Sequence, residues 1–147
     1  MNAVRRGAGA VLKYLTPLYV VLVIVQVFLA GEGIFGIKDG QSIDDAKSLD
    51  AHRGFGFILT DLGAIVFLVV TLLWWPRNKR FLGLYILLAV LLFVQAILPS
   101  AGRWVAALHP VNAFVILGLL GYLSSQWWRP DGALAQRAEP QPVSTVP

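Results

Sequence analysis

Four long apolar stretches, separated by short polar segments, dominate the pattern of the chain. They cover approximately Tyr14–Gly36, Gly54–Trp75, Phe81–Leu98 and Val111–Trp128. A helix that crosses a bilayer needs about 20 mostly apolar residues. We therefore expect an all-α integral membrane protein with four transmembrane helices, and the short connections favour an up-down-up-down bundle within residues 1–130. Pro17 lies close to the start of the first stretch, where a helix tolerates a missing N–H.

Lysine and arginine indicate the orientation, because they accumulate in cytoplasmic loops. One side of the apolar stretches carries eight of the twelve basic residues, namely Arg5, Arg6, Lys13, Arg77, Lys79, Arg80, Arg129 and Arg137. The other side carries Lys38, Lys47, Arg53 and Arg103 among acidic residues. We expect a multi-pass protein of the cell membrane with both termini cytoplasmic. Residues 131–147 are rich in proline and polar residues and are expected to form a disordered cytoplasmic tail.

The composition excludes several classes of site. The 147 residues are 57% hydrophobic and 14% charged, against roughly 25% charged residues in soluble domains. The absence of cysteine excludes disulfides, iron–sulfur clusters and thiolate metal ligands. The pI is about 9.8, but the basic residues flank apolar stretches, so the expected partner is the lipid bilayer and not nucleic acid. The chain has no G-x-S-x-G, H-E-x-x-H or phosphate-loop motif, which leaves open whether it is an enzyme.

A weak internal repeat places a glutamine-bearing helix before a histidine-started helix, twice. The four segments are Val25-Gln26-Val27-Phe28-Leu29, Ala51-His52-Arg53-Gly54-Phe55-Gly56-Phe57, Val94-Gln95-Ala96-Ile97-Leu98 and Leu108-His109-Pro110-Val111-Asn112-Ala113-Phe114. Internal symmetry of this kind is common in membrane folds. We therefore expect two repeated helix pairs, with Gln26 and Gln95 bonding between helices.

The two histidines, His52 and His109, occupy equivalent places in the repeats. The second and fourth helices run in the same direction, so both rings are expected near the outer end, at similar depth and diagonally across the bundle. Gly56 and Ala113 lie one turn deeper on the same faces and leave space beside the rings. Haem requires axial ligands and an apolar environment, so this arrangement predicts haem b with both histidines on the iron.

Arg53 and Arg103 lie at the same outer rim and are candidates for pairing with the haem propionates. The alternative is that both histidines are interfacial residues that extend toward water or bond to loops. A zinc site is disfavoured, because converging carboxylates or thiolates that would complete its shell are missing.

The stretch Leu49-Asp50-Ala51-His52-Arg53-Gly54 resembles the histidine–arginine motif that begins the second helix of haem A synthases. In that family each half is a four-helix bundle with histidines on its second and fourth helices, facing a haem. The spacing from His52 to His109 is similar to that within one half, so the resemblance implies a haem-facing role for both. The family has a glutamate where this chain has Leu49, and two bundles where this chain has one. The chain also resembles small four-helix membrane proteins of bacteria, which implies no function.

Asp61 is the one acid deep within an apolar stretch. A charged aspartate at the bilayer centre costs about 2.5–3.5 kcal/mol. Counting 100° per residue from His52 places Asp61 on the opposite face of the helix. We therefore interpret Asp61 as a contact with a partner, either a second copy of the chain or a subunit of a membrane complex. The alternative is a protonated Asp61 bonded to Thr60 or a nearby carbonyl.

Two functions follow from these features. The first is a small membrane protein that binds haem b between its second and fourth helices, for electron transfer or haem handling. The second is a cofactor-free accessory or structural subunit of a membrane complex. A transporter or channel is disfavoured, because the polar residues form no continuous lining.

Overall fold

The computed structural model describes residues 3–76 and 78–134. These residues form helices joined by turns, with no strand among them. The elements are α1 (Ala3–Phe35), the 3-10 turn η1 (Lys47–Leu49), α2 (Asp50–Phe57), the π-helical turn η2 (Ile58–Leu62), α3 (Gly63–Trp74), α4 (Lys79–Ile97), the 3-10 turn η3 (Leu98–Ser100), α5 (Arg103–Ala106) and α6 (Leu108–Trp128). The all-helical prediction is confirmed.

Four helical segments are long and apolar enough to cross a membrane. They are Ala3–Phe35, Lys47–Trp74, Lys79–Ser100 and Arg103–Trp128. The prediction of four helices of membrane-spanning length and composition is confirmed. Each segment begins earlier than the apolar pattern predicts, because polar and basic residues continue the helical backbone beyond the apolar stretch.

The largest difference is at the start of α1, which begins at Ala3 and places Pro17 in the helix interior rather than in its first turns. Proline has no N–H, so Lys13 O lacks the hydrogen bond that residue 17 would otherwise donate. The indole Nε1 of Trp128, at the end of α6, lies 3.1 Å from Lys13 O and donates to it. A side chain from another helix thus satisfies the carbonyl that Pro17 leaves free.

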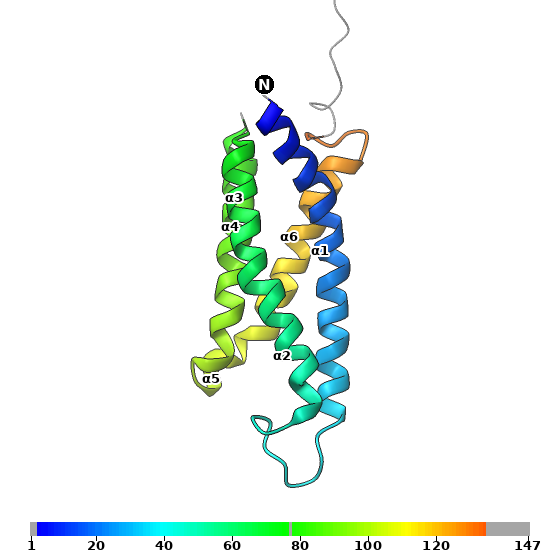
Figure 1. Ribbon diagram of the computed structural model, residues 1–147, viewed down its shortest axis with the longest axis vertical. Coiled ribbons are helices and arrows are strands. Elements are labelled where there is room, and N and C mark those ends of the chain that lie inside the picture. Colours follow the sequence, from blue (N-terminus) through cyan, green and yellow to red (C-terminus); the bar gives the residue numbers. More distant parts are fainter. Residues whose placement is uncertain (1–2, 77, 135–147) are drawn as a thin grey trace, which may run out of the picture.

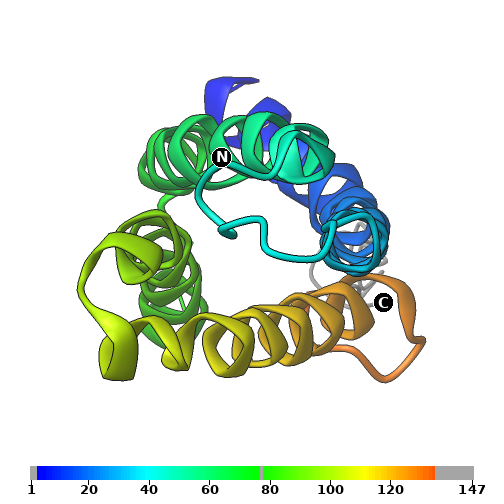
Figure 2. The same cartoon turned by 90° about the horizontal axis from the view of Figure 1, so that it is seen from below.

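The four spans surround a common axis. Helix α1 packs against α3 and α6, and α4 packs against the same two helices, so α3 and α6 lie diagonally across the bundle (Figure 2). The beginning of α1 and the end of α6 lie at one end of the molecule, here termed the terminal end (Figure 1). The end of α1, the following loop and α5 lie at the opposite end, termed the loop end (Figure 1).

Aromatic side chains fill the core toward the terminal end. The hydroxyl of the fully buried Tyr85 lies 3.0 Å from Thr16 Oγ1 and accepts a hydrogen bond of 2.8 Å from Trp127 Nε1. The ring of Trp74 lies 5.8 Å from that of Tyr85 and 5.4 Å from that of Trp127, between centroids. Because a buried polar group without a partner costs about 1–3 kcal/mol, these bonds help to fix the aromatic cluster in one arrangement.

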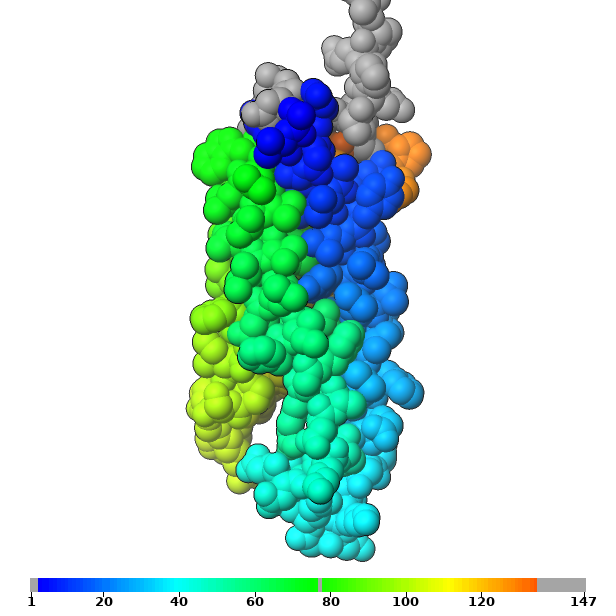
Figure 3. Space-filling model, viewed as in Figure 1, coloured from blue at the N-terminus to red at the C-terminus, as the bar shows by residue number. Residues whose placement is uncertain are grey.

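The bundle is less tightly packed toward the loop end. Every residue of α2 and α5 is exposed or half-buried. Figure 3 shows an opening between α2 and the region where α4 leads into α5. The second span and the end of the third therefore leave space between them near the loop end, in contrast to the filled core near the terminal end.

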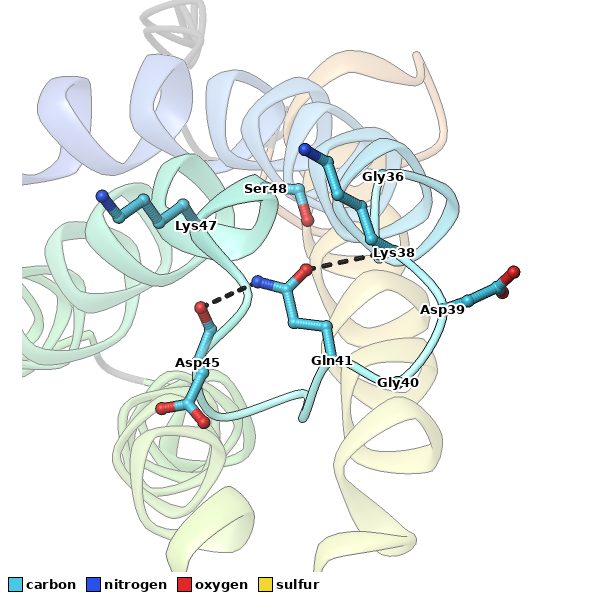
Figure 4. Close-up of a pocket in the computed structure, with 8 residues that line it drawn as sticks. All are labelled: Gly36, Lys38, Asp39, Gly40, Gln41, Asp45, Lys47 and Ser48. Carbon is cyan, nitrogen blue, oxygen red and sulfur yellow. Dashed lines mark hydrogen bonds between the residues drawn. The ribbon is translucent and has the colours of Figure 1, made fainter.

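The loop between α1 and η1 forms a hollow of about 600 Å³ on the molecular surface (Figure 4). Gln41 braces it, because its Oε1 accepts from Lys38 N at 3.3 Å and its Nε2 donates to Asp45 O at 3.1 Å. Charged residues of both signs line the hollow, which indicates a solvated connection between spans.

The first residues of the predicted tail are folded onto the end of α6. Leu134 N donates to Gln126 O at 3.0 Å, Ala133 N donates to Gln126 Oε1 at 3.2 Å, and Leu134 is buried. The remainder of the tail predicted to be disordered, residues 135–147, lies outside the described residues.

Candidate functional site

The structure brings the two histidines into contact near the loop end. His52 lies on α2 and His109 lies in the first turn of α6, and their ring centroids are 6.3 Å apart with ring planes at 79°. Both side chains are half-buried. Helix α2, which carries His52, borders the opening in Figure 3. The contact between two distant segments makes this pair the candidate site.

His109 is held at both ring nitrogens by Gln95 of α4. Its Nδ1 lies 3.2 Å from Gln95 O, and its Nε2 lies 3.2 Å from Gln95 Nε2. Gln95 O is available because the residue four positions later is Pro99, which has no N–H to donate. Asn112 donates from Nδ2 to Gln95 Oε1 at 2.7 Å and to Leu91 O at 3.0 Å. Gln95 and Asn112 are both buried, so the amide–amide bond of this network is shielded from water.

His52 has similar contacts with Gln26 of α1. Gln26 Nε2 lies 2.9 Å from His52 Nδ1 and 2.8 Å from His52 O, and Nδ1 also lies 3.3 Å from Gln26 O. Gln26 Oε1 is buried without a hydrogen-bond partner among the described residues. The position that matches Asn112 in this first pair is Phe55, which has no donor to offer. The two histidines are therefore held by the same residue type, but only one of the two glutamines is anchored.

Gly56 permits the close approach of Gln26 to α2. A Cβ at position 56 would lie 2.5 Å from Gln26 Nε2, which is shorter than real contacts allow. The sequence assigned Gly56 and Ala113 to space beside a haem. In the structure the amide of Gln26 occupies the space over Gly56, whereas Ala113 is half-buried one turn into α6.

The two rim arginines differ in their surroundings. Arg53 donates from Nη2 to Ile43 O at 2.5 Å and lies 3.3 Å from Asp50 Oδ1, so it ties the start of the second span to the connecting loop. Arg103 is exposed on α5, with its guanidinium 5.8 Å from the ring centroid of Trp104. Of the two, Arg53 is the one that bonds to the loop preceding η1.

Asp61 is half-buried in the π-helical turn η2, between the buried Thr60 and the exposed Leu62. Thr60 Oγ1 lies 2.9 Å from Gly56 O and 3.2 Å from Asp61 Oδ2, so the hydroxyl contacts both acceptors. A π-helical turn contains more residues than an α-helical turn. The count of 100° per residue from His52 therefore does not hold across η2, and it does not establish which face carries Asp61.

Sequence reasoning missed the roles of Asn112 and Pro99. The available signals were a polar residue one turn after His109 in an otherwise apolar helix, and a proline four residues after Gln95. Each signal predicts a contact with the His109 network only when α4 and α6 are known to be neighbours.

No group of three or more histidine, aspartate or glutamate side chains that could hold a metal ion occurs within residues 3–76 and 78–134. A metal site built only from protein side chains therefore has no support in the described part of the chain. Comparison of the sequence and structure with models of protein families, with curated proteins and with solved structures gives no match.

Proposed function

We propose that the chain binds haem b between its second and fourth spans, with His52 and His109 as iron ligands, and serves in electron transfer or haem handling. One observation carries this proposal: the two imidazoles lie 6.3 Å apart, and each contacts a glutamine of the preceding span. The resemblance to haem A synthases around His52 points in the same direction.

The separation of the rings suits two ligands of one metal. Imidazole nitrogens bind metals at about 2.0–2.1 Å, which together with the ring radius puts the centroids of two opposite ligands about 6 Å apart. The value of 6.3 Å agrees with this expectation. Aromatic rings in simple contact have similar separations. The surroundings of the ring nitrogens are therefore needed to distinguish metal ligands from packed rings.

Those surroundings fit haem better than a bare ion. Metal-bound histidines commonly donate their second ring N–H to a carbonyl or carboxylate, and each Nδ1 lies near a glutamine carbonyl oxygen, at 3.3 Å for His52 and 3.2 Å for His109. Haem brings the porphyrin nitrogens itself, so two histidines suffice as protein ligands. When bound, haem would supply one-electron chemistry at its iron.

The opening near the loop end supports the same reading. It adjoins α2, where the side chains are exposed or half-buried, and it gives a flat apolar ring a place between helices (Figure 3). In this proposal Arg103, on α5, pairs with a propionate, while Arg53 keeps its bonds to the loop.

The proposal includes an orientation. The spans alternate in direction as two repeated helix pairs, and both termini lie on the cytoplasmic side of the cell membrane. The support is the concentration of basic residues near the terminal end and the hydrogen bonds Gln26–His52 and Gln95–His109, each of which lies within one pair.

The second candidate function is a cofactor-free subunit of a membrane complex. The hydrogen bonds of the histidines favour it, because Gln26 and Gln95 occupy ring nitrogens without a cofactor. Asp61 also favours it, since an acid within a span implies a polar neighbour. In this case Asp61 contacts a second copy of the chain or another subunit.

An absorption spectrum of the protein purified from membranes in mild detergent, before and after dithionite, separates the two functions. We expect a reducible haem signal at about one haem per chain, lost or strongly altered in His52→Ala and His109→Ala. Ser125→Ala, near the end of α6 and far from the histidines along the helix, is the control for purification and should keep the spectrum. A spectrum without haem bands, even after haem is supplied, contradicts the haem proposal.

A further inference from the structure

The proton positions on His109 follow from neighbours with fixed roles. A carbonyl only accepts, so the atom of Asn112 that lies 3.0 Å from Leu91 O is the amide nitrogen. That nitrogen donates to Gln95 Oε1 at 2.7 Å, which leaves Gln95 Nε2 facing the ring of His109 at 3.2 Å. An amide nitrogen only donates, so His109 Nε2 carries the lone pair and Nδ1 carries the proton. The proton on Nδ1 then points to Gln95 O at 3.2 Å, which completes a consistent set.

The same reasoning gives His52 the opposite tautomer. The side-chain atom of Gln26 that lies 2.8 Å from His52 O has to be the amide nitrogen, because the carbonyl only accepts. This nitrogen also lies 2.9 Å from His52 Nδ1, which must therefore accept. His52 Nδ1 then carries the lone pair, and Nε2 carries the proton. The longer contact of 3.3 Å between Nδ1 and Gln26 O is not a hydrogen bond in this state.

We propose, resting on the proposed function, that the two histidines are unequal ligands: His109 is the permanent iron ligand, and His52 is the displaceable one. The displaceable side would take a small neutral molecule such as carbon monoxide. Gln95 and Gln26 are the positioning residues that set this difference. This inequality favours haem handling or small-molecule binding over simple electron transfer.

The two ligation steps differ in what has to move. Ligation by His109 Nε2 needs no proton transfer, because its lone pair is already there; only the amide of Gln95 has to leave it. Ligation by His52 Nε2 requires that nitrogen to lose its proton to solvent while Nδ1 gains one, so the ring stays neutral. The amide of Gln26 then has to turn away from Nδ1, and Nδ1–H donates to Gln26 O instead. His52 therefore exchanges one hydrogen bond for another and changes tautomer before it can bind.

The first test uses haem-free protein. Nitrogen NMR of the ¹⁵N-histidine-labelled protein in detergent micelles distinguishes the two neutral tautomers, and His52→Gln assigns the two signals. We expect the Nδ1–H form for His109 and the Nε2–H form for His52. The same tautomer on both residues overturns the inference. Gln26→Leu should move His52 to the Nδ1–H form, whereas Gln41→Leu, in the exposed loop, should change neither signal.

The second test uses haem-loaded, dithionite-reduced protein and carbon monoxide. We expect carbon monoxide to bind the wild type, and Gln26→Leu to weaken that binding up to about tenfold, because His52 is then already in the Nδ1–H form and competes without displacing the glutamine amide. Gln41→Leu, in the exposed loop, should leave the affinity unchanged. His52→Ala should retain haem, while His109→Ala should lose it.

Failure of the proposed function and failure of this inference give different results. Protein that never takes up haem overturns the proposed function, and with it this inference. Protein that holds haem through both histidines and binds no carbon monoxide overturns only the inference.

Discussion

Gln95 contacts His109 twice, with its carbonyl oxygen 3.2 Å from Nδ1 and its amide nitrogen 3.2 Å from Nε2. One residue thus holds an imidazole ring at both nitrogens, through main chain and side chain together. The carbonyl is free for this purpose because Pro99 cannot donate to it. The hold on His109 consequently depends on three features of the chain: an amide side chain, a proline four residues later and the anchoring Asn112.

Replacing Asn112 by leucine should destabilise the protein by about 1–3 kcal/mol, because Gln95 Oε1 and Leu91 O both lose a buried donor. The change should also free the amide of Gln95 to turn, and so weaken the fixed tautomer of His109. Thermal unfolding in detergent measures the first effect and histidine NMR the second. The control is Phe55→Leu, which changes side-chain size at the equivalent position of the first helix pair, three residues after His52. Unchanged stability together with an unchanged His109 signal would show that Asn112 does not anchor the network.

Replacing Pro99 by alanine supplies an N–H to Gln95 O and lets α4 continue. We expect His109 Nδ1 to lose its exclusive acceptor and the NMR signal of His109 to shift. The matched variant is Pro17→Ala, which supplies an N–H to Lys13 O and should change the fluorescence of Trp128 instead. Each variant should leave the other reporter unchanged. If both variants changed the His109 signal and the Trp128 fluorescence alike, separate roles for the two prolines would be contradicted.

Gly56→Ala should displace Gln26 from His52, since its Cβ would lie 2.5 Å from Gln26 Nε2. We expect a loss of about 1–3 kcal/mol, typical of overpacking, and a change in the His52 signal. Gly54→Ala lies on the same helix, where an added Cβ meets no described atom within 4 Å. That variant should gain up to about 1 kcal/mol from helix propensity. If the Gly56→Ala protein were as stable as the Gly54→Ala protein, Gln26 would have moved aside without a loss of stability.

Tyr85→Phe removes the hydroxyl that Trp127 Nε1 donates to, and it leaves that buried N–H without an acceptor. We expect a destabilisation of about 1–3 kcal/mol, measured by unfolding in detergent. Thr16 keeps a partner, because its hydroxyl also donates to Leu12 O at 2.6 Å. Tyr14→Phe, at an exposed ring, is the matched control and should change stability little. Equal effects of the two variants would argue against the buried bond.

Asp61 offers a test of partner contact. Asp61→Asn keeps an acceptor for Thr60 and should retain any assembly, whereas Asp61→Leu removes it. If Asp61 contacts a partner, cross-linking in native membranes should give a dimer or larger complex with the wild type and Asp61→Asn, reduced in Asp61→Leu. Exclusive recovery of monomer from wild-type membranes would exclude a stable contact of this kind.

Much of the fold could be predicted from the apolar stretches, since a span of about 20 such residues has few alternatives to a helix in lipid. The starts of the helices could not be predicted in this way, because residues such as Arg5 and Arg6 are not apolar and yet belong to the first turns of α1. The two histidines were identified from the repeat. Their proton positions could not be, because these depend on which atom of Gln26, Gln95 and Asn112 faces which carbonyl. The face of Asp61 was not predictable either, since a π-helical turn leaves no clear mark in the sequence.

The prolines of α1 and of the α4 terminus have a shared consequence for α6. Pro17 releases Lys13 O, which Trp128 binds, and Pro99 releases Gln95 O, which His109 binds. The two attachments are 19 residues apart, about 29 Å along a helix, close to the hydrocarbon thickness of a bilayer. Helix α6 is thus attached at both ends, to α1 at the terminal end and to α4 at the loop end. A rotation or tilt of α6 that releases the histidine would therefore also strain the tryptophan bond at the other end of the helix.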